Sequence, residues 1–222
     1  MNQNESIQNL RQQLPEPTLR RLPWYLSYVS MLKAGGVEYV SSTSISRELD
    51  VDASQIAKDL SFLNIRGKTR IGYEVAELES ELAAFLGFKD LHNAVIVGVG
   101  SLGSALVSDS GLHHYGLNIV AGFDVNPGLV GSDINGVRIY DITMLPEKCE
   151  ALDARIGILT VPVEAAQLTA DLMIDSGIRA LWNFTPIRIR TAPDIIVSNT
   201  SIYAHLAVMY NRMSRKEGEE PV

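Results

Sequence analysis

The chain has 222 residues, 46% of them hydrophobic, and a net charge of −7, which suits two small domains with buried cores and excludes wholesale disorder. No apolar run reaches the ~18 residues that a membrane span needs, and the polar N-terminus lacks the apolar core of a signal peptide. A single cysteine, Cys149, excludes an intrachain disulfide, and four scattered histidines lack metal-ligand spacing, so we expect a cytoplasmic protein with no membrane and no metal partner.

The charge is divided unevenly along the chain. Residues 17–73 hold 8 Lys and Arg against 5 Asp and Glu, whereas residues 74–222 hold 10 against 19. The net charge alone argues against nucleic acid as a partner. A basic N-terminal piece joined to an acidic C-terminal piece nevertheless indicates nucleic acid at the basic end.

The first predicted element is a helix. We expect residues 1–16 to be a flexible N-terminus. From Thr18 to Leu32, apolar residues then recur at helical spacing, and Pro23 inside this run allows a kink or a late start.

Two short helices are predicted next, after a brief extended segment at residues 37–40. Either Ser41 or Ser42 can cap the first of them. Asp52 is a suitable N-cap for the second, and Gln55 three residues on completes a capping-box spacing. Two short helices joined by a tight turn, after a longer helix, predict a helix-turn-helix.

A short hairpin is predicted after the second short helix. Residues 64–75, NIRGKTRIGYEV, place Gly67 and Gly72 around a basic tip. A hairpin in this position is typical of the wing of a winged helix, whose tip touches phosphates or the minor groove. A polar surface hairpin on a small helical domain is the alternative. We expect residues 17–87 to form a winged-helix DNA-binding domain that an amphipathic helix at 76–87 closes.

From residue 88 the predicted elements are strands that alternate with helices. The expected strands are 93–97, 118–123, 155–160, 180–183 and 195–199, and the expected helices are 101–115, 144–151 and 163–176. This alternation predicts an α/β fold, a doubly wound and mainly parallel Rossmann-like sheet over residues 88–199. We expect a last helix, Ser201–Met213, within residues 200–214 and a charged tail at 215–222.

The stretch AVIVGVGSLGSAL contains a G-x-G-x-x-G formed by Gly98, Gly100 and Gly103. A strand precedes it and a helix follows it, and in this context such a loop holds the pyrophosphate of a dinucleotide on backbone N–H groups. Asp124 ends the next strand, where its carboxylate can accept hydrogen bonds from the adenosine ribose and repel a 2′-phosphate. The sequence therefore predicts NAD(H) rather than NADP(H), with a glycine-rich turn that binds nothing as the alternative.

Two further segments follow strands of the predicted sheet, Thr160–Pro162 and Asn183–Pro186. Doubly wound sheets bind ligands at the carboxyl ends of their strands, although ordinary strand-to-helix turns are the alternative. Residues 155–200 contain no His and no Lys, and the chain has no Tyr-x-x-x-Lys. The acid/base group that a hydride-transfer enzyme needs is missing, so we expect a protein that is not an enzyme.

With both halves in view, the sequence resembles the Rex family of redox-sensing transcriptional repressors over about residues 15–213. The likeness is carried by PEPTLRRLPWYL, VSSTSISREL, QIAKDLSF, RGKTRIGYEV, VIVGVGSLGSAL, FDVNP, ILTVPVEAAQ and NFTPIRI. The resemblance implies a homodimer that exchanges its C-terminal helices and senses the NADH/NAD⁺ balance. It implies binding to palindromic operator DNA by the free or NAD⁺-bound protein and release of that DNA when NADH binds.

The resemblance also implies two sets of site residues. The DNA contacts would be Ser41, Ser42, Gln55, Lys58, Ser61, Gly67, Lys68, Thr69, Arg70 and Tyr73. The cofactor contacts, to NADH or NAD⁺, would be Gly98, Val99, Gly100, Ser101, Leu102, Gly103, Asp124, Val125, Thr160, Val161, Pro162, Asn183, Phe184, Thr185 and Pro186. Ser27 and Ser201 stand where some family members carry an arginine and an aspartate that pair across the dimer, so that pair cannot be the switch contact here.

Two other functions compete with this interpretation. One is an NAD-dependent dehydrogenase or reductase with an accessory N-terminal domain, which the glycine loop supports and the missing acid/base group opposes. The other is a nucleotide- or coenzyme A-binding module with no role on DNA, since such modules share the pattern of the second domain.

Overall fold

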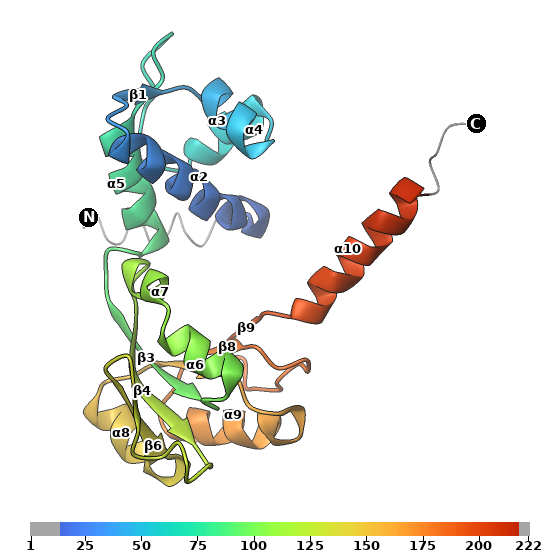
Figure 1. Cartoon of the computed structure of the whole chain (residues 1–222). Coiled ribbons are helices and arrows are strands. Elements are labelled where there is room, and N and C mark those ends of the chain that lie inside the picture. The colour runs from blue at the N-terminus through green and yellow to red at the C-terminus, as the bar shows by residue number, and fades with distance from the viewer. Residues whose placement is uncertain (1–13, 218–222) are drawn as a thin grey trace. The chain divides into compact units, whose positions relative to one another are not determined.

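The computed structural model describes residues 14–217, and the chain divides into two compact units, Met1–Asp90 and Leu91–Val222 (Figure 1). Residues 1–13 and 218–222, which hold most of the expected flexible N-terminus and of the expected tail, lie outside the described residues.

The first unit is a small helical domain with a two-stranded sheet. Its elements are α2 (Glu16–Ala34), β1 (Tyr39–Val40), α3 (Ser42–Leu49), α4 (Ala53–Leu60), β2 (Tyr73–Glu74) and α5 (Val75–Leu86). Helix α2 begins at Glu16 with a proline in its first turn, so Pro23 does not delay its start. It buries an apolar face at helical spacing, formed by Leu22, Tyr25, Leu26 and Val29.

Both short helices begin at a side-chain cap. Ser41 accepts a hydrogen bond from the Ser44 backbone N–H at 3.0 Å and is therefore the cap of α3. Asp52 caps α4 by accepting from the backbone N–H groups of Ser54 (2.7 Å) and Gln55 (3.3 Å). The predicted capping box is wrong in its second half, because the Gln55 amide does not return to the cap and instead donates to Asp59.

The hairpin after α4 leads into β2, and β2 pairs with β1 to form the sheet of this unit. Strands β1 and β2 are antiparallel, with Val40 opposite Tyr73, and Lys68 pairs with Gly72 just before β2. Gly72 has a φ of +103°, and a Cβ there would lie 2.3 Å from the Val40 carbonyl oxygen. Only glycine fits this close approach, which anchors the hairpin to β1.

The second unit holds a seven-stranded sheet in the order β5-β6-β4-β3-β7-β8-β9. Its strands are β3 (His92–Val97), β4 (Leu117–Asp124), β5 (Asp133–Ile134), β6 (Val137–Asp141), β7 (Ile156–Leu159), β8 (Ala180–Asn183) and β9 (Ile196–Asn199). Every pairing is parallel except that of the short β5 with β6. The chain reverses its direction of winding between β3 and β7, the topological switch point of a Rossmann-like sheet.

Both faces of this sheet are buried, as the alternating side chains of β3 show. Val95 and Val97 belong to a core that also contains Met173 from α9 (Ala166–Asp175) and residues of α8 (Leu145–Ala151). Ile96, on the opposite face, packs in a second core with Val107 from α6 (Ser101–Val107). Burial on both faces explains why the strand sequences are continuously apolar.

Four helical segments differ from their predicted form. Residues 101–115 form two helices, α6 and α7 (Ser110–His114), because Asp109 caps a new helix by accepting from the Gly111 N–H. The helix predicted at 163–176 begins with a 3₁₀ turn, Val163–Ala165 (η2), before α9, and a second such turn, Ile142–Met144 (η1), precedes α8. The last helix, α10, spans Ile202–Glu217 and extends past the predicted end at 214.

The β5–β6 hairpin is absent from the predicted elements because its strands span only two and five residues. Its turn has a local signal nonetheless. Asn135 and Gly136 have φ values of +50° and +85°, the left-handed pair that an Asn-Gly hairpin turn requires.

Candidate functional site

The glycine loop lies between β3 and α6, at the switch point of the sheet. Gly98 has a φ of +92°, and a Cβ there would lie 2.8 Å from backbone atoms of Thr160. A Cβ at Gly103 would lie 2.1 Å from the Gly98 carbonyl oxygen, so this glycine lets α6 pack against the end of β3. Two of the three glycines are therefore required by close packing alone.

Gly100 has a different role from the other two glycines of the loop. A Cβ at Gly100 would meet nothing within 4 Å, and the residue is exposed as the N-cap of α6. It has no side chain to bond the first-turn N–H groups of that helix, which leaves them to a ligand. Open space in front of backbone N–H groups and the positive end of a helix dipole suits an anion such as a pyrophosphate.

Asp124 is held against this loop by both of its carboxylate oxygens. Oδ2 accepts from the Val99 backbone N–H at 2.7 Å, and Oδ1 accepts from the Asn126 N–H at 2.9 Å. Each carboxylate oxygen has a second lone pair, so the group can still accept hydrogen bonds from ribose hydroxyls. Val125 follows with 71% of its side chain exposed, beside the predicted ribose position.

A hollow of about 370 Å³ lies next to the loop, at the carboxyl ends of β7 and β8. Its walls are Leu102, Thr160, Val161, Pro162, Val163, Phe184, Thr185, Pro186, Ser201, Ile202 and Tyr203. The lining contains no Lys, Arg, His, Asp or Glu side chain, and Tyr203 is its one ionisable residue. The structure thus brings together the two predicted strand-end segments and adds the start of α10, which the same strand-end argument applied to β9 would have identified.

Two predicted cofactor contacts have their polar atoms engaged within the protein. The Thr160 hydroxyl donates to the Gly98 carbonyl oxygen at 2.7 Å and so fastens the glycine loop to β7. Asn183 is fully buried: its Nδ2 donates to the Ile187 carbonyl (2.7 Å) and to Asn199 Oδ1 (2.8 Å), and its Oδ1 accepts from the Thr185 hydroxyl (2.7 Å). Asn183 therefore shapes the turn that lines the hollow and does not itself face into it.

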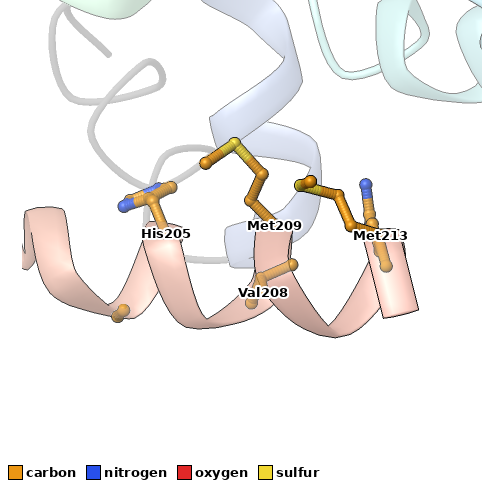
Figure 2. A pocket seen from close by; sticks show the side chains of 6 residues that line it. His205, Val208, Met209 and Met213 are labelled. Carbon is orange, nitrogen blue, oxygen red and sulfur yellow. The ribbon is translucent and has the colours of Figure 1, made fainter. Parts of the chain in front are cut away.

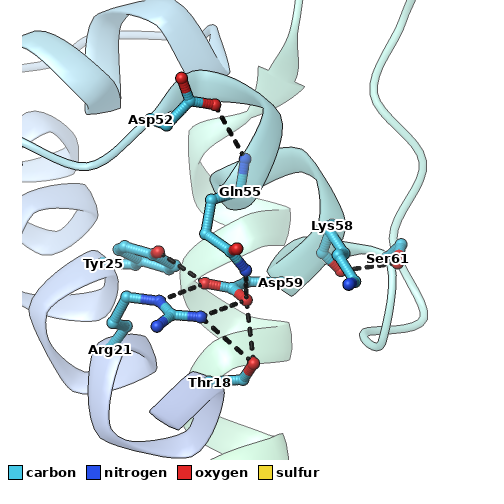
Figure 3. Close-up of polar contacts among 8 residues, drawn as sticks. All are labelled: Thr18, Arg21, Tyr25, Asp52, Gln55, Lys58, Asp59 and Ser61. Carbon is cyan, nitrogen blue, oxygen red and sulfur yellow. Dashed lines mark hydrogen bonds and ion pairs between the residues drawn. The ribbon is translucent and has the colours of Figure 1, made fainter.

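In the first unit, α4 presents a polar face opposite its buried side. Lys58 and Ser61, drawn in Figure 3, are exposed, whereas Ile56 and Leu60 are fully buried. The Ser61 hydroxyl donates to the Lys58 carbonyl at 2.6 Å and so closes the end of the helix. A short capped helix with an exposed lysine and small polar neighbours can enter a major groove and contact phosphates or base edges.

The hairpin after α4 carries the predicted basic tip, Lys68, Thr69 and Arg70, and all three residues are exposed. Lys68 Nζ donates to the Tyr39 hydroxyl at 2.9 Å and lies 4.8 Å from the centroid of that ring. This hydrogen bond raises the pKa of Lys68, so the ammonium stays charged. Tyr39 is a functional candidate that the sequence does not single out, because it lies 29 residues from its partner.

Tyr73, the last predicted contact of the hairpin, is half-buried. A Cβ at Gly67 would lie 3.2 Å from the Tyr73 ring, and burial raises the pKa of the Tyr73 hydroxyl. The Tyr73 ring therefore packs closely against Gly67 of the hairpin.

Within residues 14–217, no helix is long and apolar enough to cross a membrane. The same part of the chain contains no group of three or more His, Cys, Asp or Glu side chains placed to hold a metal ion.

Two protein-family models match the chain, one in each unit. The family described as "Putative DNA-binding protein N-terminus" matches residues 13–61, and the family described as "CoA binding domain" matches residues 89–187.

Curated relatives are similar over nearly the whole length. The "Redox-sensing transcriptional repressor Rex" of Bacteroides thetaiotaomicron is 58% identical over 98% of this chain and 99% of its own. The protein of the same name from Treponema denticola is 38% identical over 90% and 98%.

Solved structures of one protein, RSP, resemble the chain in fold and sequence. RSP in complex with β-NAD⁺ and operator DNA has a TM-score of 0.86 at 33% identity, covering 94% of this chain and 99% of its own. RSP in complex with β-NADH has a TM-score of 0.83 at 34% identity, covering 92% and 96%.

Proposed function

The chain belongs to the Rex family of redox-sensing transcriptional repressors, and from this premise we propose how its two units carry out that function. It is a DNA-binding repressor that senses the balance of NADH and NAD⁺. We propose that it acts in the cytoplasm, binds palindromic operator DNA when free or loaded with NAD⁺, and releases the DNA when NADH binds. The observation that carries this proposal is that one chain holds both an open glycine loop beside Asp124 and an exposed helix-and-hairpin surface with Lys58, Lys68 and Arg70.

The dinucleotide would bind at the glycine loop and the adjoining hollow. The α6 N-terminus in front of Gly100 would hold the pyrophosphate, and Asp124 would hold the adenosine ribose and exclude a 2′-phosphate. The nicotinamide half would enter the hollow that Thr160–Val163 and Phe184–Pro186 line. A neutral dihydronicotinamide suits this uncharged lining better than the cationic ring of NAD⁺, because an unpaired charge is costly to desolvate.

The DNA would bind to the first unit through α4 and the hairpin. Lys58 and Ser61 would lie on the major-groove side, and Lys68, Thr69 and Arg70 would contact phosphates or the minor groove. Two copies related by a two-fold axis would occupy the two half-sites of a palindrome.

We propose that α10 joins two such copies in a homodimer by helix exchange. Its apolar side chains Ile202, Tyr203, Val208, Met209, Tyr210 and Met213 are between 48% and 66% exposed, and Figure 2 shows His205, Val208, Met209 and Met213 along the helix. An exposed apolar face of this extent gains stability when a second copy covers it. Light scattering of the full chain should give a dimer mass, and a chain that ends at Thr200 should give a monomer mass. A monomeric full chain would contradict the exchange.

NADH and operator DNA must oppose each other, because a ligand shifts an equilibrium only by its differential affinity for the two states. The coupling is reciprocal, so operator DNA must weaken NADH binding by the same factor by which NADH weakens DNA binding. NADH titrations of the full chain with and without operator duplex, followed by nucleotide fluorescence, test the proposal directly. Equal NADH affinities in the two titrations would refute it.

No chemical step is part of this proposal. The relatives are named as repressors, and the hollow offers Tyr203 as its one ionisable side chain, with no lysine or histidine in its lining. A panel of hydroxy acids and aldehydes with NAD⁺ or NADH, followed at 340 nm, should show no turnover. Turnover of any of these compounds would contradict this expectation and support a dehydrogenase function.

A further inference from the structure

Asp59 occupies a position on α4 where the pattern calls for an apolar side chain, between the buried Ile56 and Leu60. It is fully buried, and its carboxylate accepts hydrogen bonds from four side chains (Figure 3). On α2 these are the Thr18 hydroxyl (3.0 Å), the Arg21 guanidinium (2.7 and 2.8 Å) and the Tyr25 hydroxyl (2.7 Å); on α4 itself it is Gln55 Nε2 (2.8 Å).

This carboxylate is charged at neutral pH. Burial by itself raises the pKa of Asp59, but the hydrogen bonds from Arg21, Tyr25, Gln55 and Thr18 together bring it below its usual value. Arg21 supplies the compensating charge through an ion pair whose arginine side chain is 27% exposed. An ionised carboxylate can only accept hydrogen bonds, so each group that faces it must be a donor.

The charge on Asp59 sets the direction of the Gln55 amide. A glutamine amide can present its oxygen or its nitrogen, and the two ends differ in what they recognise. Asp59 accepts from the Gln55 nitrogen, which turns the carbonyl oxygen Oε1 away from the buried network. Among residues 14–214 no side chain or backbone group donates a hydrogen bond to Oε1, and Gln55 is partly exposed.

Gln55 also occupies the part of α4 that recognition helices use. Helix α4 begins directly after its cap Asp52, and Gln55 is its third residue. The N-terminal residues of a recognition helix contact base edges in the major groove. In that groove, adenine N6 and cytosine N4 are the donors that an acceptor can read. The amide nitrogen carries two hydrogens and gives one of them to Asp59, so the outward Oε1 is the group whose direction this bond fixes.

We propose that Asp59 is a positioning residue for DNA recognition, which orients the Gln55 amide so that its carbonyl oxygen accepts a hydrogen bond from the exocyclic amino group of an adenine or cytosine. The inference rests on the proposed function, because it requires that α4 enter a major groove.

The test uses the full chain and a duplex that it selects from a random oligonucleotide library. In both half-sites, each adenine is replaced in turn by purine, which lacks the 6-amino group, and each cytosine by 2-pyrimidinone, which lacks the 4-amino group. We expect one position at which the loss weakens binding about tenfold per half-site, the effect of one base-edge hydrogen bond. Gln55→Met, of similar size and helix propensity, should lose this sensitivity, which separates a lost contact from weakened base pairing.

A further arm addresses the amide's direction. Asp59→Asn should reduce the tenfold discrimination, whereas Thr18→Ala, which removes another donor to the same Oδ1 but leaves the Gln55 bond, should retain it. NADH affinity reports that the second unit is intact in each variant, and the Gln55→Met comparison stands even where Asp59→Asn does not fold.

The proposal is overturned if no amino-group removal distinguishes the full chain from Gln55→Met, or if a folded Asp59→Asn variant keeps full discrimination. Recovery of no duplex from the library would overturn the proposed function as well. Binding of a selected duplex without any amino-group sensitivity would overturn only the role of Asp59 and Gln55.

Discussion

Gly103→Ala should lower the stability of the second unit and Gly100→Ala should lower its NADH affinity, because the structure gives the two glycines different surroundings. At Gly103 the new Cβ would lie 2.1 Å from the Gly98 carbonyl oxygen and 3.2 Å from the Thr160 hydroxyl. Relief of that clash needs a shift of roughly 1 Å between α6 and the end of β3, and overpacking of this kind costs about 1–3 kcal/mol. For a domain of this size the melting temperature should fall by roughly 5–10 °C.

At Gly100 the new Cβ would meet nothing within 4 Å, so the fold should keep its stability. The methyl group would stand in the space that we assign to the pyrophosphate, and NADH affinity should fall about tenfold or more, which corresponds to about 1.4 kcal/mol. The Gly100→Ala repressor should therefore remain on operator DNA at NADH concentrations that release the wild-type protein.

Calorimetry gives the melting temperature, nucleotide fluorescence gives the NADH affinity, and a mobility shift with increasing NADH gives the release. Each variant is the control for the other, because both add one methyl group to the same loop. Wild-type NADH affinity in Gly100→Ala would refute the assignment of the pyrophosphate position. An unchanged melting temperature in Gly103→Ala would refute the packing argument.

Three other substitutions probe the hairpin, the buried carboxylate and the thiol. Lys68→Ala should weaken operator binding and lower the slope of log affinity against log salt concentration by about 1. Lys148→Ala, a control in the second unit, should change neither the affinity nor the slope. An unchanged slope for Lys68→Ala would show that the hairpin does not contact DNA phosphates. Because hydrogen bonds hold the pKa of Asp59 below its usual value, its stabilising contribution is complete above about pH 5 and is lost as the pH falls through the lowered pKa. Urea midpoints between pH 7 and pH 3 should therefore fall more steeply for the wild-type protein than for Asp59→Asn, and parallel curves would contradict this. Cys149→Ala should keep the full NADH response, since the thiol is 2% exposed and burial raises its pKa to about 11; a lost response would point to thiol chemistry as the sensor.

The glycine loop shows what local sequence can predict. Steric limits on φ and the apolar pattern of the flanking strand and helix are properties of neighbouring residues, so this pattern together with the spacing of Gly98, Gly100 and Gly103 identifies a strand–loop–helix unit. The same holds for the caps at Ser41 and Asp52, which the structure confirms. The alternation of buried strands and helices likewise predicts the parallel sheet.

Contacts between residues far apart in the sequence determine features of the site that the sequence does not predict. Asn183 lies in a segment that the sequence correctly places at a strand end, yet its amide bonds to Ile187 and Asn199 and does not face the hollow. The break of the helix predicted at 101–115 is by contrast a local effect, because Asp109 caps a new helix by accepting a hydrogen bond from the Gly111 N–H.

The sequence by itself determined the two-unit organisation, the Rossmann-like glycine loop and the position of Asp124 at the end of the next strand, because these depend on backbone sterics and on short-range periodicity. Only the tertiary structure decided which polar atoms remain available to a ligand. Asp59 meets Thr18 across 41 residues, and through the same carboxylate the Gln55 amide acquires its direction. Hydrogen-bond direction in a buried network depends on every donor that packing brings to it, and no spacing along the chain encodes that set.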